Sequence, residues 1–213
     1  MKFFKIFCFL FLVAICAQAQ SKPQVFDLEK LTWYGVDCSH LQCIGDYSHW
    51  GDKNRLKDIY MPAWNNVILN EPEKFNLSYF FYCNNIDTDI KVATELNAAI
   101  TTDSLVERYT RKSKYMSETE ISQHIKSYYK SNKKGWGVVF MPENFDGYTK
   151  RAVIDLIIFD IESGDIALMK RLNSIGGGVG IRNYWVNTVH TCLNSVRKSW
   201  KGWKHEAKSK NNG

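Results

Sequence analysis

The fold is decided by residues 150–203, which read KRAVIDLIIFDIESGDIALMKRLNSIGGGVGIRNYWVNTVHTCLNSVRKSWKGW. The run Arg151–Ile161 is the most apolar stretch outside the first twenty residues, and both of its alternating faces are hydrophobic. A strand with two apolar faces is covered on both sides, so it belongs inside a sheet. A turn at Glu162–Asp165 predicts a hairpin with a return strand over Ile166–Leu172. The apolar stripe of Trp185–Trp203 then predicts an amphipathic helix that covers this hairpin.

The upstream chain supplies further strands and helices. We expect strands over Leu31–Asp37, Ile86–Ile100 and Gly137–Met141, a helix from Asp52 interrupted by Pro62, and a turn over Glu143–Tyr148. A capping box of Ser117 and Glu120 opens another helix, with Ile121, Ile125 and Tyr128 on its buried face. The resulting order, β-α-β-α-β-β-β-α, predicts a single α+β, or mixed α/β, domain. Its central mixed sheet would carry a C-terminal β-hairpin covered by amphipathic helices.

The first 19 residues have the pattern of a secretory signal peptide. Lys2 and Lys5 precede an apolar run that ends in a small-x-small cleavage site, Ala17–Ala19. We therefore expect an exported protein, periplasmic or secreted. Lipid anchoring at Cys16 is the less favoured alternative, because Ile15 stands where a lipobox has a small residue. We expect a flexible lead-in at residues 20–30, one domain at 31–205 and a disordered tail at 206–213.

Charge and hydropathy exclude two classes of partner. The net charge is +6, and removal of Lys2 and Lys5 lowers it to +4, which is too weakly basic for a nucleic-acid-binding signature. No later segment has the ~20 apolar residues of a membrane-spanning helix. No cofactor motif is present either, so the expected partner is a protein of the cell envelope or the extracellular space.

Four cysteines follow the signal peptide, and export would allow them to form disulfides. Cys38 and Cys43 are the nearest pair, but a bond between them requires a turn through residues 39–42. The alternatives are free buried thiols and a metal site. The sequence does not decide between these three outcomes.

The densest group of chemically capable side chains lies in residues 37–49. The candidate catalytic residues are Asp37, Ser39, His40 and His49, because nucleophilic catalysis needs a hydroxyl or thiol, a base and a group that orients the base. The competing interpretation is structural: Asp37 ends a strand and Ser39 stabilises a turn. The segment has no metal-ligand spacing, so no metal site is assigned.

A glycine run precedes the last helix and is the candidate anion site. Free amides at a helix start bind anions. The candidate ligand-binding residues are Gly176, Gly178, Gly180, Arg182 and Asn183. The run lacks the lysine of a phosphate-binding loop and has Ile181 where a dinucleotide fingerprint has glycine. A tight strand-to-helix turn explains the glycines equally well. Asp155, inside an apolar strand, needs a partner such as Arg182 or a solvent-facing position.

Three segments carry a resemblance to a known group of proteins. They are Thr32–Ser39 (TWYGVDCS), Pro62–Asn65 (PAWN) and Gly176–Trp185 (GGGVGIRNYW). Together they resemble an uncharacterised family of small secreted proteins from Gram-negative bacteria. The chain is also distantly similar to small α/β envelope domains: the periplasmic activators of penicillin-binding proteins, the curli-secretion channel protein and the N-terminal domain of the Tol translocation protein. The resemblance implies an envelope location and partner binding but no activity.

These observations order the functional hypotheses. The leading one is a non-enzymatic exported domain that binds a partner in the envelope or outside the cell. The second is a secreted hydrolase that uses the Asp37–His49 cluster. The third is an anion-binding module at the Gly176–Arg182 turn. A pocket that unites His40 or His49 with a carboxylate and a nucleophile would favour the second hypothesis over the first.

Overall fold

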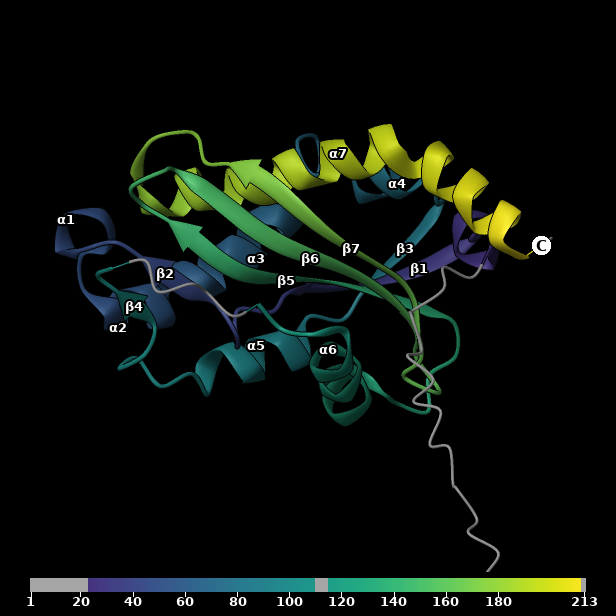
Figure 1. Cartoon of the computed structure of the whole chain (residues 1–213), viewed down its shortest axis with the longest axis horizontal. Helices are drawn as coiled ribbons and strands as arrows, with labels where there is room; N and C mark the ends of the chain where they lie inside the picture. Colours follow the sequence, from purple (N-terminus) through teal and green to yellow (C-terminus); the bar gives the residue numbers. More distant parts are fainter. Residues whose placement is uncertain (1–22, 110–114, 212–213) are drawn as a thin grey trace, which may run out of the picture.

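The computed structural model describes residues 23–109 and 115–211 of the 213-residue chain. The signal peptide at residues 1–19 and the alternative lipid site Cys16 therefore lie outside the described residues. The described chain has an α+β fold built on one seven-stranded mixed sheet, as the sequence predicts (Figure 1). Its strands are β1 Lys30–Val36, β2 Gln42–Ile44, β3 Asn85–Thr88, β4 Val106–Glu107, β5 Trp136–Asp146, β6 Arg151–Asp160 and β7 Ile166–Ile175.

The long strand β5 is the centre of the sheet. On one side it pairs antiparallel with β6, which pairs antiparallel with β7. On the other side it pairs parallel with β1 along its first half and with β2 along its second half. The edge strand β3 pairs with β1, and the edge strand β4 pairs with β2, both in parallel. β1 and β2 thus pair with the same edge of β5, one after the other. The connection between them, residues 37–41, turns away from β5, and the candidate site lies at this connection.

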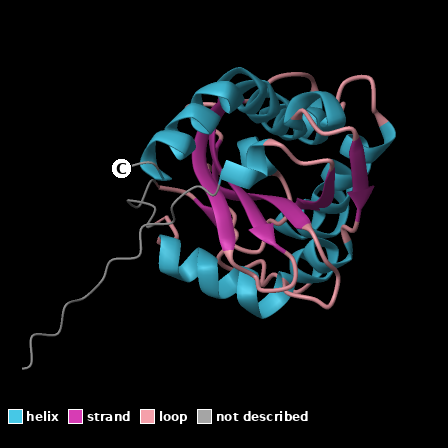
Figure 2. Ribbon diagram, turned by 90° about the vertical axis from the view of Figure 1, so that its right-hand side faces the viewer, coloured by secondary structure: helices cyan, strands magenta, loops and turns pink. Residues whose placement is uncertain are grey.

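Helices cover both faces of the sheet (Figure 2). They are the 3₁₀-helix η1 Pro23–Phe26, the α-helices α1 Tyr47–Trp50, α2 Lys53–Arg55, α3 Met61–Asn70, α4 Leu77–Phe81, α5 Lys91–Ala98, α6 Glu118–His124 and α7 Gly180–Asn211, and the π-helices η2 Leu56–Tyr60 and η3 Ile125–Tyr129. In Figure 1, α7 and α4 lie on one side of the strands, and α5 and α6 lie on the other.

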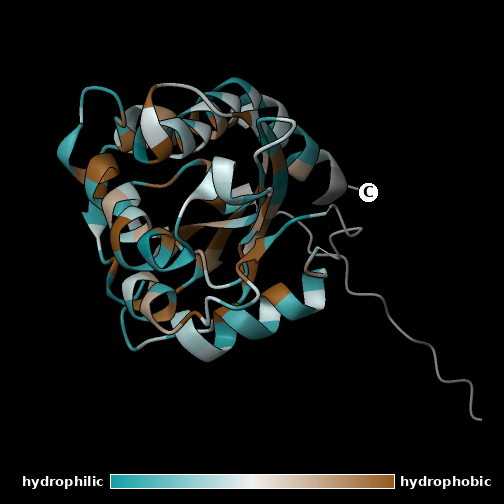
Figure 3. Ribbon diagram, turned by 90° about the vertical axis from the view of Figure 1, so that its left-hand side faces the viewer, coloured by the Kyte–Doolittle hydropathy of each residue, from teal (hydrophilic) through white to brown (hydrophobic). Residues whose placement is uncertain are grey.

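The two alternating faces of β6 contribute to two separate cores, as its sequence predicts. Ala152, Ile154, Leu156 and Ile158 join the larger core, which includes residues of α3, α4 and α7. Ile157 and Phe159, with Ile161 just after the strand, join the smaller core, which includes Ile121 of α6 and Ile125 and Tyr129 of η3. Figure 3 shows the hydrophobic strands enclosed by helices whose outer faces are hydrophilic. Burial on both faces explains why β6 needs apolar residues at both alternations.

The strand predicted over Ile86–Ile100 is wrong: β3 ends at Thr88 and α5 runs from Lys91 to Ala98. The apolar residues with period two also satisfy helical spacing, because Val92 and Leu96 are four residues apart and pack against the smaller core. The hydroxyl of Thr94 donates to the carbonyl of Ile90, a bond within the helix. Sequence periodicity alone could not separate the two alternatives.

Two segments predicted as irregular are ordered. The turn expected over Glu143–Tyr148 begins too early, since β5 continues to Asp146 through a bulge between Pro142 and Asn144. Proline is tolerated in a strand at a bulge of this kind. At the C-terminus, α7 continues through the segment 206–211 that was expected to be disordered, and Ala207 is buried in the larger core.

The lead-in was also expected to be flexible. Within it, Val25 and Phe26 of η1 are buried, and the Phe26 ring packs edge-on against Trp200 of α7 at 5.1 Å. In the part of the chain that the structure describes, no helix has the length and apolarity needed to span a membrane.

Candidate functional site

Asp37 follows the last residue of β1, at the carboxyl end of a parallel strand. Its backbone N–H still donates to the Phe140 carbonyl of β5, and the chain then turns away toward β2. In sheets with parallel strands, ligands bind outside the carboxyl ends, where neighbouring connections diverge. The position of Asp37 therefore makes this end of β1 the first place to look for a functional site.

Two buried asparagines hold the backbone where β1 leaves the sheet. Asn65 of α3 accepts from the Val36 N–H at 2.7 Å and donates to the Val36 carbonyl at 3.1 Å. Asn97 of α5 accepts from the Cys38 N–H at 2.6 Å and also donates to the Val36 carbonyl at 3.0 Å. These side chains replace the strand partner that β1 lacks beyond the end of β3, which pairs with β1 only as far as Trp33. Buried backbone groups require such partners.

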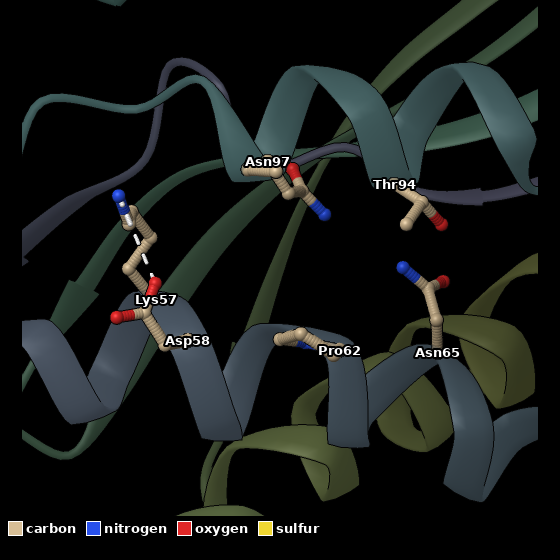
Figure 4. Close-up of a pocket in the computed structure, with 7 residues that line it drawn as sticks. Lys57, Asp58, Pro62, Asn65, Thr94 and Asn97 are labelled. Atoms are coloured by element: carbon tan, nitrogen blue, oxygen red, sulfur yellow. Dashed lines mark ion pairs between the residues drawn. The ribbon is translucent and has the colours of Figure 1, made fainter.

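Glycine is required at position 35, beside these two asparagines. Gly35 has φ +92°, and a β-carbon at this position would lie 2.6 Å from Asn65 Oδ1. Asn65 and Asn97 also line a cavity of about 180 Å³ between η2–α3 and α5, with Thr94 and Pro62 (Figure 4). Both amides are engaged with the β1 backbone, so we assign this cavity a structural role.

Asp37 is fully buried, and three donors converge on its carboxylate. His124 Nε2 and the Tyr129 hydroxyl each donate to Oδ2 at 2.8 Å, while the Ser39 N–H donates to Oδ1 at 2.9 Å. Burial alone would raise the pKa of Asp37, but the hydrogen bond and charge of His124, with the bond from the Ser39 N–H, lower it below its ordinary value. Asp37 is therefore an ionised carboxylate inside the protein at neutral pH.

The π-helix η3 brings His124 and Tyr129 to the same oxygen. These residues are five apart, which is the hydrogen-bond spacing of a π-helix and one residue more than an α-helix provides. The sequence predicts Tyr128 on the buried face, on the assumption of an α-helical repeat. That prediction is wrong: Tyr128 is 53% exposed and Tyr129 is buried. The extra residue in the turn shifts the buried position by one.

His40 extends this chain of hydrogen bonds to the surface. Its Nε2 lies 3.3 Å from Nδ1 of His124, and the two rings meet edge-on at 4.9 Å. Because His124 Nε2 must carry a proton to donate to ionised Asp37, its Nδ1 is the acceptor when the ring is neutral. His40 then donates from Nε2, which leaves its own Nδ1 unprotonated. The order Asp37–His124–His40 thus fixes the tautomers and presents a base at the surface.

The electrostatics keep His40 available as a base. Burial and the neighbouring His124 lower its pKa, and the charges of Asp37 and Glu120 oppose this shift without reversing it. His40 is therefore neutral at pH 7. If His124 takes up a proton, it remains bonded to Asp37 and can donate from Nδ1 to His40. The pair can consequently pass a proton in either direction.

A cavity of about 340 Å³ opens over the two histidines. Its lining residues are His40, Met116, Glu120, Gln123, His124, Ser127 and Tyr128. The cavity is at the lower end of the usual range for ligand pockets, which suits a small molecule or a single group of a larger one. Among the described residues, no serine or cysteine side chain is hydrogen-bonded to His40, so the site holds a base and its orienting groups but no protein nucleophile activated by that base.

The structure divides the four candidate catalytic residues. Asp37 and His40 belong to the site, and Ser39 contributes its backbone N–H while its hydroxyl is buried without a partner among the described atoms. His49 lies elsewhere: it is bonded to Asp46 at 2.8 Å in the capping box of α1 and packs on Tyr148. His124 and Tyr129 were not anticipated. The available signal was a histidine on the apolar face of the helix that buries Ile121.

The four cysteines that the structure describes form no disulfide. Cys38, Cys43, Cys83 and Cys192 are free and buried, so the candidate disulfide between Cys38 and Cys43 is wrong. Burial raises the pKa of both Cys38 and Cys43, which keeps them as inert thiols. Within residues 23–109 and 115–211, no three histidine, cysteine or acidic side chains are grouped to hold a metal ion.

The glycine run lies at the start of α7, as expected from the sequence. The Gly176 and Gly177 amides donate to the Lys150 and Tyr184 carbonyls, and a β-carbon on Gly176 would lie 2.1 Å from the Tyr184 ring. Close packing therefore accounts for the first glycines.

The later glycines of the run, Gly178 and Gly180, have φ of +105° and +78°. The side chains of Arg182 and Asn183 are bonded to each other at 2.9 Å. Gly180 also lines a cavity of about 190 Å³ with His49, Lys150 and Tyr184.

Asp155 has a partner other than the expected Arg182. It is fully buried and faces Arg171 on the neighbouring strand, which donates from Nε at 2.9 Å and from Nη2 at 2.7 Å. A bidentate guanidinium of this kind is the usual compensation for a buried carboxylate. The signal in the sequence was the hairpin itself, because its register pairs Asp155 with Arg171.

No protein-family model matches the chain, and no curated protein matches it.

Proposed function

We propose that the protein is a hydrolase in which His40 is the general base. The observation that carries this proposal is the chain of hydrogen bonds from buried Asp37 through His124 to His40 at the wall of a cavity. A carboxylate that orients a histidine and stabilises its protonated form is a recurring device of acid–base catalysis. Here Asp37 bonds to His124 and His124 bonds to His40, so the base is the histidine at the solvent-exposed end of the chain.

Water is the nucleophile in this proposal, because His40 has no bonded serine or cysteine among the described residues. His40 Nδ1 takes a proton from a water molecule as the water oxygen bonds to the electrophilic carbon or phosphorus of the substrate. The proton on His40 Nε2 moves toward His124, whose positive charge Asp37 stabilises. His40 then returns a proton to the leaving oxygen or nitrogen, so that the site ends in its starting state.

The dimensions of the cavity restrict the substrate. A cavity of about 340 Å³ takes a small ester, amide or phosphoester, or one such group of a longer chain. Tyr128 provides an aromatic wall that packs against the His124 ring at 5.0 Å, and it is half exposed toward solvent. The export expected from residues 1–19 would place this substrate outside the cytoplasm.

The proposal is tested by screening the purified protein against a panel of chromogenic esters, amides and phosphoesters. We expect His40→Ala and His124→Ala to remove any activity found, while His49→Ala, a change to a histidine outside the cavity, leaves it intact. Asp37→Asn should also lose activity, because an asparagine amide donates to His124 and imposes the wrong tautomer. Activity that survives His40→Ala, or no activity against the whole panel, counts against a hydrolase.

A separate surface favours partner binding as the second candidate function. Arg197 of α7 lies between the rings of Tyr79 and Tyr82, 4.2 Å and 3.2 Å from their centroids, and both tyrosines are at least 40% exposed. Tyrosine and arginine are enriched in the energetic centres of protein interfaces. If this surface binds an envelope protein, a Tyr79→Ala, Tyr82→Ala double variant should lose a partner recovered by pull-down with the wild type, and His40→Ala should retain it.

A further inference from the structure

A second buried cluster of charges lies next to the His40 cavity and contacts its wall. Glu143 lies at the bulge in β5, Asp155 on β6 and Arg171 on β7. Arg171 Nη2 donates to Glu143 Oε1 at 3.1 Å in addition to its two bonds to Asp155. Two carboxylates thus share one guanidinium, which leaves the cluster with one negative charge too many when both are ionised.

The same cluster fixes the backbone of Met116, a residue that lines the His40 cavity. Glu143 Oε1 accepts from the Met116 N–H at 2.9 Å, and Arg171 Nη2 donates to the Met116 carbonyl at 2.9 Å. The guanidinium also stacks on the preceding Tyr115 ring at 4.7 Å. Both polar groups of one peptide residue are therefore held by side chains from the sheet, just before α6 begins.

We infer that Glu143, Asp155 and Arg171 form a proton-dependent clamp that positions the Met116 wall of the His40 cavity. When Glu143 carries a proton it can donate to Asp155, and its other oxygen still accepts from Met116 and Arg171. When Glu143 is ionised, that bond to Asp155 is lost and two negative charges face each other in a buried place. The bonds from Met116 and Arg171 favour the ionised form of Glu143, but burial and Asp155 outweigh them, so ionisation weakens the clamp as a whole.

The titration falls in a useful range of pH. Burial, together with the hydrogen bond and charge of Asp155, raises the pKa of Glu143 to about 7, against the opposing effects of Met116 and Arg171. The charged and titratable groups that the cluster presents to Glu143 are Asp155, Arg171 and the Tyr115 hydroxyl behind the guanidinium. Because the folded pKa is raised, the stabilisation is complete below the ordinary value and is lost as the pH rises through about 7.

The test is hydrogen exchange of the Met116 amide, followed by NMR and corrected for the intrinsic effect of pH. The protonated fraction of Glu143 falls from about nine-tenths to about one-tenth between pH 6 and pH 8, so protection should fall about tenfold over this range. Glu143→Gln retains the bonds of the protonated acid but cannot ionise. Its protection should be the same at both pH values.

Two further variants complete the experiment. Arg171→Met removes the donor to the Met116 carbonyl and should lower protection at every pH. Lys170→Met is the matched control, because Lys170 points to the opposite face of β7, over the Trp203 ring, and it should behave as wild type. If Arg171→Met does not fold, Glu143→Gln alone still decides the matter. Flat protection in the wild type, or a fall in Glu143→Gln equal to that of the wild type, would overturn the inference.

This inference concerns the regulation of the proposed hydrolytic site and so rests on that proposal. The two can nevertheless fail independently, because exchange at Met116 is measured without any substrate. A clamp that titrates in a protein inactive on the whole substrate panel would leave the clamp standing and refute the hydrolase. Activity that depends on His40 in a protein whose Met116 protection is flat would do the reverse.

Discussion

Replacing Tyr129 by phenylalanine tests the π-helix and the burial of Asp37 together. The Tyr129 side chain is buried, and its hydroxyl donates to the ionised Asp37 carboxylate at 2.8 Å. A hydrogen bond to a charged group contributes ~1.5–3 kcal/mol, and both partners of this one are buried away from solvent. For a chain of this size 1 kcal/mol corresponds to roughly 2–4 °C, so we expect the melting temperature to fall by about 3–12 °C.

The neighbouring residue supplies the control. Tyr128→Phe removes a hydroxyl from a half-exposed ring, and a surface change of this kind should alter the free energy of unfolding by less than ~0.5 kcal/mol. Both variants are measured by urea unfolding at pH 7. An α-helical turn at this place would reverse the two results. Equal losses, or a larger loss in Tyr128→Phe, would refute the π-helical register and the role assigned to Tyr129.

The effect of Tyr129→Phe should also depend on pH in a defined direction. The folded-state pKa of Asp37 is lowered, so its stabilisation is present above the ordinary value of 3.8 and is lost as the pH falls through the lower folded-state value. The hydroxyl of Tyr129 stabilises the charged form of Asp37. The difference in stability between wild type and Tyr129→Phe should therefore be complete at neutral pH and shrink in acid.

Three further predictions concern the frame around the site. Gly35→Ala should lower the free energy of unfolding by about 2–4 kcal/mol in urea, because an alanine at φ +92° is strained and its β-carbon would press on Asn65 Oδ1. Cys38 and Cys43 should be alkylated only after denaturation, with the same yield with or without a reductant, when the modified peptides are mapped by mass spectrometry. Arg182→Ala should change the melting temperature by no more than about 2 °C, since its side chain is exposed and bonded only to neighbouring Asn183 among the described residues.

The sequence was informative wherever burial imposes a simple period. The two apolar faces of β6 are visible as alternating residues, and the structure places them in two different cores. The same reasoning failed over Ile86–Ile100, because Val92 and Leu96 fit both a strand and a helix. It also failed at Tyr128 and Tyr129, where one extra residue in a π-turn changes which side chain is buried. Local insertions of this kind depend on what the helix packs against, so no periodicity within the helix reveals them.

The candidate site was predictable only in part, for a related reason. Asp37 and His40 are close in sequence and could be grouped, and the grouping drew attention to the end of β1. Their partners His124 and Tyr129 are more than 80 residues away and reach Asp37 only because α6 and η3 pack on the sheet. His49 shows the opposite error: it is near in sequence, but the turn after β2 carries it to another cavity.

This arrangement makes stability and chemistry inseparable at some residues and separable at others. Asp37 is an ionised group with no exposure, so any change that removes a donor from it destabilises the fold as well as the site. His40 is different, because it is accessible to solvent and its bond to His124 is the outermost of the chain. His40→Ala should therefore leave the free energy of unfolding within ~0.5 kcal/mol of wild type, and it is the variant whose loss of activity can be attributed to chemistry alone.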